Sequence, residues 1–329
     1  MRCRILGLIV TLTLRVLVTP LAVDAQAPVK AARLGWLRST PETPEWRRNF
    51  DAFTQELHDH GYVEGQNVTI AFRSPTEPAT PLSALLGELL QFQPDVIVGG
   101  GPAAVDAARQ ATTTVPIVAL DYERDPVASG LVESYSHPGG NLTGVFLDFP
   151  AFSGKWLELL REVVPGLARV AVLWDPATGP IQVRGLESAA RPVGVQLHVL
   201  EVRRVDDFAG AFRTAMPAQP DAVIALSAPL VDSYRQHLAA LAVTHRLPAI
   251  TLRPSFARDG GLMAYGPDQT DLFRQAARLV VKILHGATPA DLPIERPMQF
   301  KLVINLKTAQ ELGLTIPPTL LFQADEIIR

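Results

Sequence analysis

The chain has 329 residues, of which 47% are hydrophobic and 19% charged, and its formal net charge is −3 at pH 7. This composition is that of an ordinary globular protein and contains no sign of nucleic-acid binding. The length is sufficient for two lobes, each with its own hydrophobic core.

The first 25 residues have the pattern of a secretory signal peptide. Arg2 and Arg4 form a basic start, residues 5–14 are mainly apolar, and Val23-Asp24-Ala25 is a small-residue cleavage site before Gln26. The apolar run is shorter than the roughly 20 residues that a membrane-spanning helix needs. We therefore expect an exported, periplasmic protein.

The only cysteine of the chain is Cys3. It precedes the apolar run of the signal peptide, whereas the anchor cysteine of a lipoprotein would follow that run. We expect a soluble protein without a lipid anchor, and one that has neither disulfides nor thiol catalysis after cleavage.

Strand and helix patterns alternate through the first half of the chain. The strands are expected at residues 33–38, 68–72, 96–98 and 117–120, and the helices between them at residues 46–57, 81–92 and 103–111. Strands joined by helices are parallel. The sequence therefore predicts a first lobe with a parallel sheet.

The most informative stretch of this lobe is residues 93–126. A short apolar strand runs into Gly99-Gly100-Gly101-Pro102, a helix follows, and the next strand ends at Asp121-Tyr122. In parallel sheets, ligands bind beyond the carboxyl ends of the strands, where helix N-termini offer free N–H groups. We therefore expect the glycine turn and Asp121-Tyr122 to face one crevice.

A helix-like piece at residues 127–135 and a strand at residues 142–146 follow. The alternating pattern then starts again, and its helices include one expected at residues 231–245. The expected fold is α/β, with two Rossmann-like lobes that have parallel sheets and are joined by a hinge. We expect the first lobe at residues 26–147, completed by about 264–290, and the second at residues 148–263, completed by about 291–329.

Several separated blocks share their residues and order with a known family. They are residues 61–68 (GYVEGQNV), 126–144 with its PGGNLTG, 170–176 (VAVLWDP), 260–268 (GGLMAYGPD), and 303–309 (VINLKTA) with 313–318 (GLTIPP). Together they resemble the ABC-transporter substrate-binding protein family, whose studied members bind aromatic amino acids. The resemblance implies a type I periplasmic-binding-protein fold with three hinge crossings, no catalysis, and delivery of a small solute to a membrane permease.

The resemblance also implies where the ligand loops lie. They follow the strands of both lobes, at Ser39, Thr40, Gly100, Gly101, Pro102, Ala103, residues 121–125, Trp174, Asp175 and Ser227. One position departs from the family, because members often carry a Ser or Thr hydroxyl where this chain has Gly101. The α-carboxylate of an amino acid would then rely on backbone N–H groups.

The glycine turn allows two interpretations. Gly100, Gly101 and Ala103 could cradle a ligand carboxylate, or the glycines could only supply the backbone geometry of a strand-to-helix turn. The spacing Gly99-x-Gly101-x-x-Ala104 also fits a dinucleotide fingerprint. It follows the third strand rather than the first, so we expect no such cofactor.

The acidic and aromatic candidates also allow both a ligand-binding and a structural interpretation. Asp125 could hold a ligand ammonium or cap the segment that follows it, and the same choice applies to Asp121 and Asp175. Tyr122 and Trp174 could stack on a flat ligand or cover the core of a lobe.

The remaining polar candidates also have alternatives. Ser39 and Thr40 could bind a carboxylate or cap a helix that starts near Pro44. Ser227 has no GxSxG sequence around it, so we do not expect a nucleophile there. Arg253 could reach the crevice or pair on the surface, and we expect the surface.

No sequence motif of a metal site or of a catalytic centre is found, so we expect no metal, no catalytic residue and no cofactor. The leading interpretation is a periplasmic solute-binding component of an ABC transporter that closes over an amino acid or related carboxylate and works with a permease of the inner membrane, for which a monomer suffices. The alternatives are an exported α/β enzyme that acts at the same crevice and a ligand-sensing receptor module of the same fold.

Overall fold

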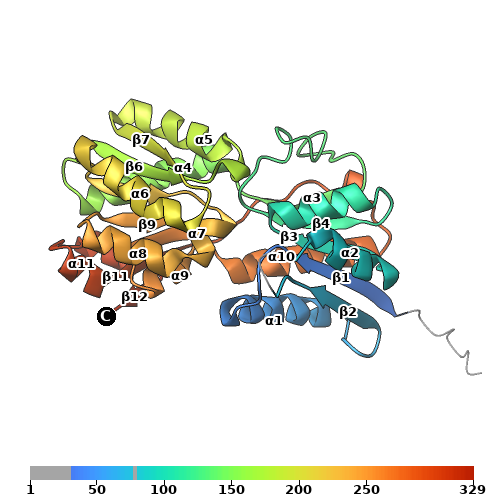
Figure 1. Cartoon of the computed structure of the whole chain (residues 1–329). Coiled ribbons are helices and arrows are strands. Elements are labelled where there is room, and N and C mark those ends of the chain that lie inside the picture. Colours follow the sequence, from blue (N-terminus) through green and yellow to red (C-terminus); the bar gives the residue numbers. More distant parts are fainter. Residues whose placement is uncertain (1–30, 77–79) are drawn as a thin grey trace, which may run out of the picture. The chain divides into compact units, whose positions relative to one another are not determined.

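The computed structural model describes residues 31–76 and 80–329 of the chain (Figure 1). The expected signal peptide, with Cys3 and the cleavage site at Gln26, lies outside the described residues. Residues 31–329 form a compact unit of their own that contains two β-sheets with helices on their faces. The expected α/β fold with two mainly parallel sheets is confirmed.

The first sheet has the strand order β2-β1-β3-β4-β5, and all its strand pairs are parallel. The strands are β1 Ala32–Arg38, β2 Val68–Arg73, β3 Val96–Gly100, β4 Ile117–Asp121 and β5 Leu142–Phe146. The helices that connect them are α1 Pro44–Asp59, α2 Leu82–Gln91 and α3 Pro102–Ala111. Because the strands are parallel, their carboxyl ends meet at one edge of the sheet.

The second sheet has the order β12-β11-β10-β9-β8-β6-β7, in which only the β10–β11 pair is antiparallel. Its strands are β6 Arg169–Trp174, β7 Gln196–Glu201, β8 Ala222–Ala225, β9 Ala249–Thr251, β10 Met263–Pro267, β11 Phe300–Asn305 and β12 Glu326–Ile328. The helices of this part are α4 Phe149–Val163, α5 Ile181–Ala190, α6 Val205–Ala215, α7 Pro229–Ser233, α8 Arg235–Thr244, α9 Pro254–Arg258, α11 Leu306–Glu311 and α12 Pro318–Gln323.

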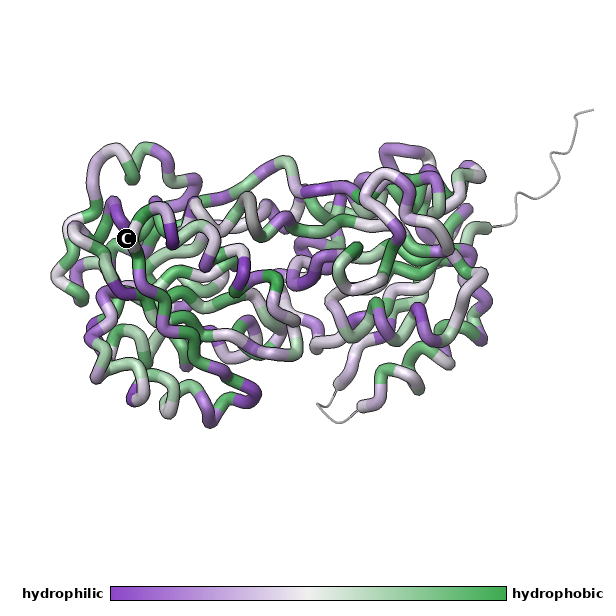
Figure 2. Tube along the Cα trace, turned by 90° about the horizontal axis from the view of Figure 1, so that it is seen from above, coloured by the Kyte–Doolittle hydropathy of each residue, from purple (hydrophilic) through white to green (hydrophobic). Residues whose placement is uncertain are grey.

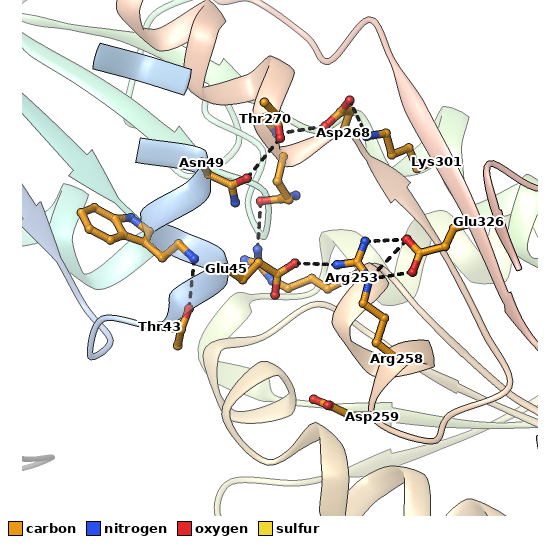
Figure 3. Close-up of polar contacts among 12 residues, drawn as sticks. Thr43, Glu45, Asn49, Arg253, Arg258, Asp259, Asp268, Thr270, Lys301 and Glu326 are labelled. Atoms are coloured by element: carbon orange, nitrogen blue, oxygen red, sulfur yellow. Dashed lines mark hydrogen bonds and ion pairs between the residues drawn. The ribbon is translucent and has the colours of Figure 1, made fainter. Parts of the chain in front are cut away.

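Within the described residues, the chain passes between the two sheets three times. The first passage follows β5, the second lies at Asp268 between β10 and the long helix α10 Gln269–Leu284, and the third leads into β11. Ion pairs connect these passages. Arg296 Nη1 lies 3.0 Å from Asp148 Oδ2. Lys301 Nζ lies 2.9 Å from Asp268 Oδ2, and Figure 3 shows this second pair. The expected hinge therefore consists of three chain segments that connect the lobes and lie side by side.

The central strands of both sheets are buried on both faces, and Figure 2 shows hydrophobic segments in the interior of each lobe. Alternate residues of one strand reach different cores: Trp36 packs in one cluster and Leu37 in another. Helix α10 packs against α1 and against the first sheet, and Phe273 of α10 stacks on Trp36 at 5.3 Å between ring centroids. Residues 264–290, which were expected to complete the first lobe, are therefore divided between the two lobes. Strand β10 belongs to the second sheet, whereas α10 packs on the first lobe.

Two expected helices differ in the structure. Residues 127–135 form turns, because Gly130 has φ +67° and closes a loop whose Ser129 N–H donates to Asp125 O at 3.0 Å. The helix expected at residues 231–245 is divided into α7 and α8 at Tyr234. None of the helices in the described part of the chain has the length and apolar character that crossing a membrane requires.

Candidate functional site

The main cleft lies at the carboxyl ends of the strands of the first sheet. It encloses about 750 Å³ of space, part of it open to solvent. The first lobe lines most of it, α10 contributes Gln269 and Phe273, and the second lobe contributes Pro229, Asp232 and Arg253. Residues from both lobes therefore form one cleft.

The structure brings together part of the set of residues expected from the sequence. Ser39, Thr40, Gly100, Gly101 and Tyr122 all line this cleft. They come from the ends of β1, β3 and β4, which are adjacent in the sheet. The parallel arrangement of the strands is the physical reason for their convergence.

The glycine turn has a specific geometry at Gly101. Its φ is +91°, a region that favours glycine, and its N–H already donates to Leu120 O at 2.9 Å. A Cβ atom at this position would lie 2.8 Å from Ser39 Oγ, which itself donates to Gly100 O at 3.3 Å. The hydroxyl of Ser39 thus occupies the space that a side chain at position 101 would need.

Arg38 and Trp36 line the same cleft, although sequence reasoning did not select them. Arg38 Nη2 donates to Thr40 Oγ1 at 2.7 Å, and the guanidinium carbon lies 4.9 Å from the centre of the Trp46 ring. Burial, together with the charge of Arg253, lowers the pKa of Arg38 to about 10. The sequence signal was the two-residue spacing in β1, which places both side chains on one face of the sheet.

The surface position expected for Arg253 is wrong, because this residue lines the cleft. Its Nη1 donates to Gln269 Oε1 at 3.0 Å, and its Nε lies 3.4 Å from Asp232 Oδ2. The guanidinium carbon also lies 5.7 Å from the centre of the Tyr122 ring. Since Arg253 follows β9, the rule that places sites at strand ends applies to it as well.

A buried polar network connects the two lobes next to the cleft. Ser227, which follows β8, donates from Oγ to Glu123 Oε1 at 2.9 Å, and Glu123 follows β4. Gln182 of α5 donates from Nε2 to Ser227 O at 2.8 Å and to Glu123 O at 3.3 Å. Burial and the neighbouring charge of Asp121 raise the pKa of Glu123 to about 7. Ser227 is therefore placed in a contact between the lobes.

Asp121 and Pro102 belong to a clamp around Arg124. Asp121 is fully buried, and its Oδ2 accepts a hydrogen bond from Arg124 Nε at 2.7 Å. Arg124 also donates to both carboxylate oxygens of Asp106 at 2.8 and 2.9 Å and to Pro102 O at 3.1 Å. The clamp joins the end of β4 to the first turn of α3 and so holds the glycine turn in position. The side chain of Ala103 lines a separate groove beside α2.

Asp125 and Asp175 act as caps. Asp125 Oδ1 accepts from the two backbone N–H groups of residues 127 and 128 at 2.8 and 2.9 Å. Asp175 Oδ1 accepts from Ala177 N at 3.0 Å at the start of a 3₁₀ turn. Trp174 donates from Nε1 to Gly179 O at 3.0 Å and packs against a lobe core. These residues are not part of the lining of the main cleft.

Helices α1 and α9 approach each other near the cleft opening. Arg258 Nη1 lies 3.6 Å from Glu45 Oε1, and Arg258 Nη2 lies 2.6 Å from Glu326 Oε2 (Figure 3). One turn further along α1, Thr270 Oγ1 donates to Asn49 Oδ1 at 3.3 Å. In residues 31–76 and 80–329, no group of His, Cys, Asp and Glu side chains has an arrangement that could hold a metal ion.

Comparison with known proteins identifies several relatives. A family model described as ABC transporter substrate binding protein matches residues 42–328. The structure is similar to an ABC domain from Streptococcus pneumonia in complex with L-Trp (TM-score 0.82, 26% identity, 91% of this chain and 100% of the other). It is also similar to a conserved domain protein from Vibrio cholerae (TM-score 0.81, 25% identity, 91% and 100%). A tyrosine-binding protein of Clostridioides difficile is 24% identical over 275 residues, which are 83% of this chain and 79% of the relative.

Proposed function

Because the chain belongs to the family of ABC transporter substrate-binding proteins, we propose that it is an exported periplasmic receptor. It closes its two lobes over a small solute, an amino acid or a related carboxylate, and delivers that solute to an ABC permease in the inner membrane. The resemblance noted in the sequence is confirmed by the match over residues 42–328. The single observation that supports the proposal most strongly is a cleft lined by residues of both lobes.

A cleft of this kind couples binding to closure. A solute that touches Arg38 of the first lobe and Arg253 of the second makes contacts that exist together only when the lobes are close. Such a solute binds the closed arrangement better and therefore raises its population. A permease can then distinguish loaded receptor from empty receptor by the positions of the two lobes.

The relatives support a carboxylate-bearing solute. One is described as a tyrosine-binding protein and another was solved with L-Trp. The cleft of this chain is lined by Trp36, Trp46, Tyr122 and Phe273 and by two arginines. Aromatic walls and cationic groups suit a small acid with an apolar body.

A catalytic role at the same crevice has less support. At this crevice the hydroxyl of Ser227 donates to the carboxylate of Glu123 at 2.9 Å, and the two residues are 5% and 2% exposed. Gln182 binds the backbone of both residues, so the group has the form of a contact between lobes. We therefore assign it to closure and not to nucleophilic attack.

The proposal is tested by binding. The protein is exported from a bacterial host, unfolded and refolded to remove bound solute, and screened by thermal shift against amino acids, small carboxylates, purines and nicotinamide dinucleotides. A solute at about 100 times its dissociation constant adds roughly 2.7 kcal/mol to the free energy of unfolding. Small-angle scattering with and without each hit then measures closure.

A carboxylate or amino acid that raises the melting midpoint and decreases the radius of gyration supports the receptor. A dinucleotide hit, or turnover of any hit, contradicts it in favour of an enzyme. Deletion of the gene in the source organism tests delivery, since uptake of the labelled solute should fall. Unchanged uptake would favour a sensory module of the same fold.

A further inference from the structure

We propose that the solute is bound as an acid with an apolar body, that its carboxylate is anchored by Arg38 and Trp36, and that an ammonium group is not required. This inference rests on the proposed receptor function and specifies the class of solute. Its basis is the hydrogen bonding of the residues that line the cleft: some of their polar atoms already have hydrogen-bond partners, and others have none.

Three buried polar atoms at the cleft have no hydrogen-bond partner among the described residues. They are Arg38 Nη1, Trp36 Nε1 and Tyr122 Oη. Two of the three can only donate a hydrogen bond, and the third is a hydroxyl that can donate one. Buried donors without partners cost free energy, so their presence together at one cleft points to a ligand that brings acceptors.

The indole N–H of Trp36 and the side-chain stem of Arg38 both lie close to Gly100 of the glycine turn. A Cβ atom built on Gly100 would lie 3.6 Å from Arg38 Cγ and 3.8 Å from Trp36 Nε1. Because Gly100 has no side chain, this space is not blocked by the turn. A carboxylate has two oxygens and can accept from a guanidinium and an indole N–H at the same time.

The backbone of the turn is less available for this role. The N–H of Gly101 donates to Leu120 O at 2.9 Å, and the carbonyl of Gly100 accepts from Ser39. Pro102, which starts α3, has no N–H to offer. The side chains of Arg38 and Trp36 therefore offer donors to the carboxylate where Gly101 and Pro102 do not.

The acidic side chains of the cleft already have partners. Glu45 pairs with Arg258, Glu123 accepts from Ser227, and Asp232 lies 3.4 Å from Arg253 Nε. None of these carboxylates is among the unpartnered buried atoms of the described residues. An ammonium group on the solute would have to compete with existing partners, whereas a carboxylate would meet free donors.

The charge of Arg38 supports the same conclusion. Its pKa is lowered to about 10 by burial first and by Arg253 second. A guanidinium in this situation lacks full compensation by the protein, and a bound anion would supply it. The body of the solute would lie against Leu120, Trp46 and Phe273, which form the apolar part of the wall.

Matched compounds test the inference. Hydrocinnamate is L-phenylalanine without its ammonium group, and phenethylamine is L-phenylalanine without its carboxylate. The corresponding indole compounds form a second series. Affinities are measured by calorimetry on the refolded protein at pH 7.5 or a similar pH. We expect the acids to bind at least as tightly as the amino acids and the amines not to bind.

Variants test the anchor. Arg38→Met should weaken acid binding roughly 10- to 100-fold, the range for a lost hydrogen bond to a charged group, and Arg38→Lys should retain part of the affinity. Arg47→Met is the matched control, because Arg47 lies on α1 with its side chain 71% exposed and pairs with Glu42 outside the cleft lining. The melting midpoint of each unliganded variant shows that it is folded.

Three results would overturn the inference. They are amino acids that bind more than tenfold tighter than the matched acids, no binding of any acid, and Arg38→Met with wild-type affinity. The receptor proposal is judged separately, by closure of the lobes. An amino acid or another solute that closes them would still support it. A hit that is turned over, in contrast, would refute the receptor and leave the acid anchor in place.

Discussion

The contact between Ser227 and Glu123 allows a sharp test of how the lobes are held together. Ser227→Ala removes a hydroxyl that donates to Glu123 Oε1 at 2.9 Å in a site where both residues are at least 95% buried. A hydrogen bond to a charged group contributes about 1.5–3 kcal/mol, and one between neutral groups about 0.5–1.5 kcal/mol. The decrease in the free energy of unfolding caused by Ser227→Ala should therefore depend on whether Glu123 is ionised.

The direction of the pH dependence follows from the pKa of Glu123. Burial and Asp121 raise this pKa from 4.5 to about 7, so the folded state binds its proton more tightly than the unfolded state does. The free energy of unfolding should then fall as the pH rises from about 4.5 to about 7 and level off above that. The hydroxyl of Ser227 stabilises the ionised form of Glu123. Ser227→Ala should therefore lower the free energy of unfolding more at pH 8 or so than at pH 5 or so.

Urea unfolding of the wild type and of two variants provides the assay. Ser255→Ala is the matched control, because Ser255 is also 5% exposed but its Oγ has no partner among the described residues. We expect a loss of about 1.5–3 kcal/mol at the higher pH for Ser227→Ala, a smaller loss at the lower pH, and little change for Ser255→Ala. Equal losses for the two serines, or a loss independent of pH, would show that the contact is not the cause.

Three further predictions concern the same region and the N-terminus. Glu123→Gln should remove most of the fall in unfolding free energy between about pH 4.5 and pH 7, and a variant that keeps the wild-type slope would assign the effect to another group. Arg124→Met should cost about 3–5 kcal/mol in urea unfolding because it leaves the fully buried Asp121 without its cation, whereas Arg203→Met, in an exposed pair, should cost less than about 1 kcal/mol. Mass spectrometry of the exported protein should find Gln26 as the first residue, and an intact N-terminus would contradict the signal peptide.

Much of the fold could be predicted because its causes are local. Apolar runs of strand length, helical spacing and turn residues lie next to each other in the chain, so the alternation of strands and helices is visible without a structure. The glycine turn could be placed at a crevice for the same reason, and it lines the cleft with Ser39 and Tyr122. The expected helix at residues 127–135 failed because Asp125 and Gly130 favour a closed turn.

The sequence could not show whether each acidic candidate caps a helix or turn or faces the ligand crevice. Asp125 and Asp175 have backbone N–H groups two residues ahead that they can accept from wherever the cleft lies. Asp121 faces Arg124, which is close in sequence, but the clamp also needs Asp106 and Pro102 of α3. A strand-end position alone does not tell which way a side chain turns.

The two α/β lobes, the strand ends that form the cleft and the blocks that identify the family could be predicted from the sequence, because each depends on residues that are near one another along the chain. Three features are visible only in the folded chain: Arg38 and Trp36, which line the cleft, have donors without partners among the described residues, Arg253 reaches the cleft from the second lobe, and α10 packs on the first lobe. These features depend on contacts between segments far apart in sequence, such as Glu123 with Ser227, 104 residues later. Periodicity and turn chemistry contain no information on such pairs, so only the folded chain shows them.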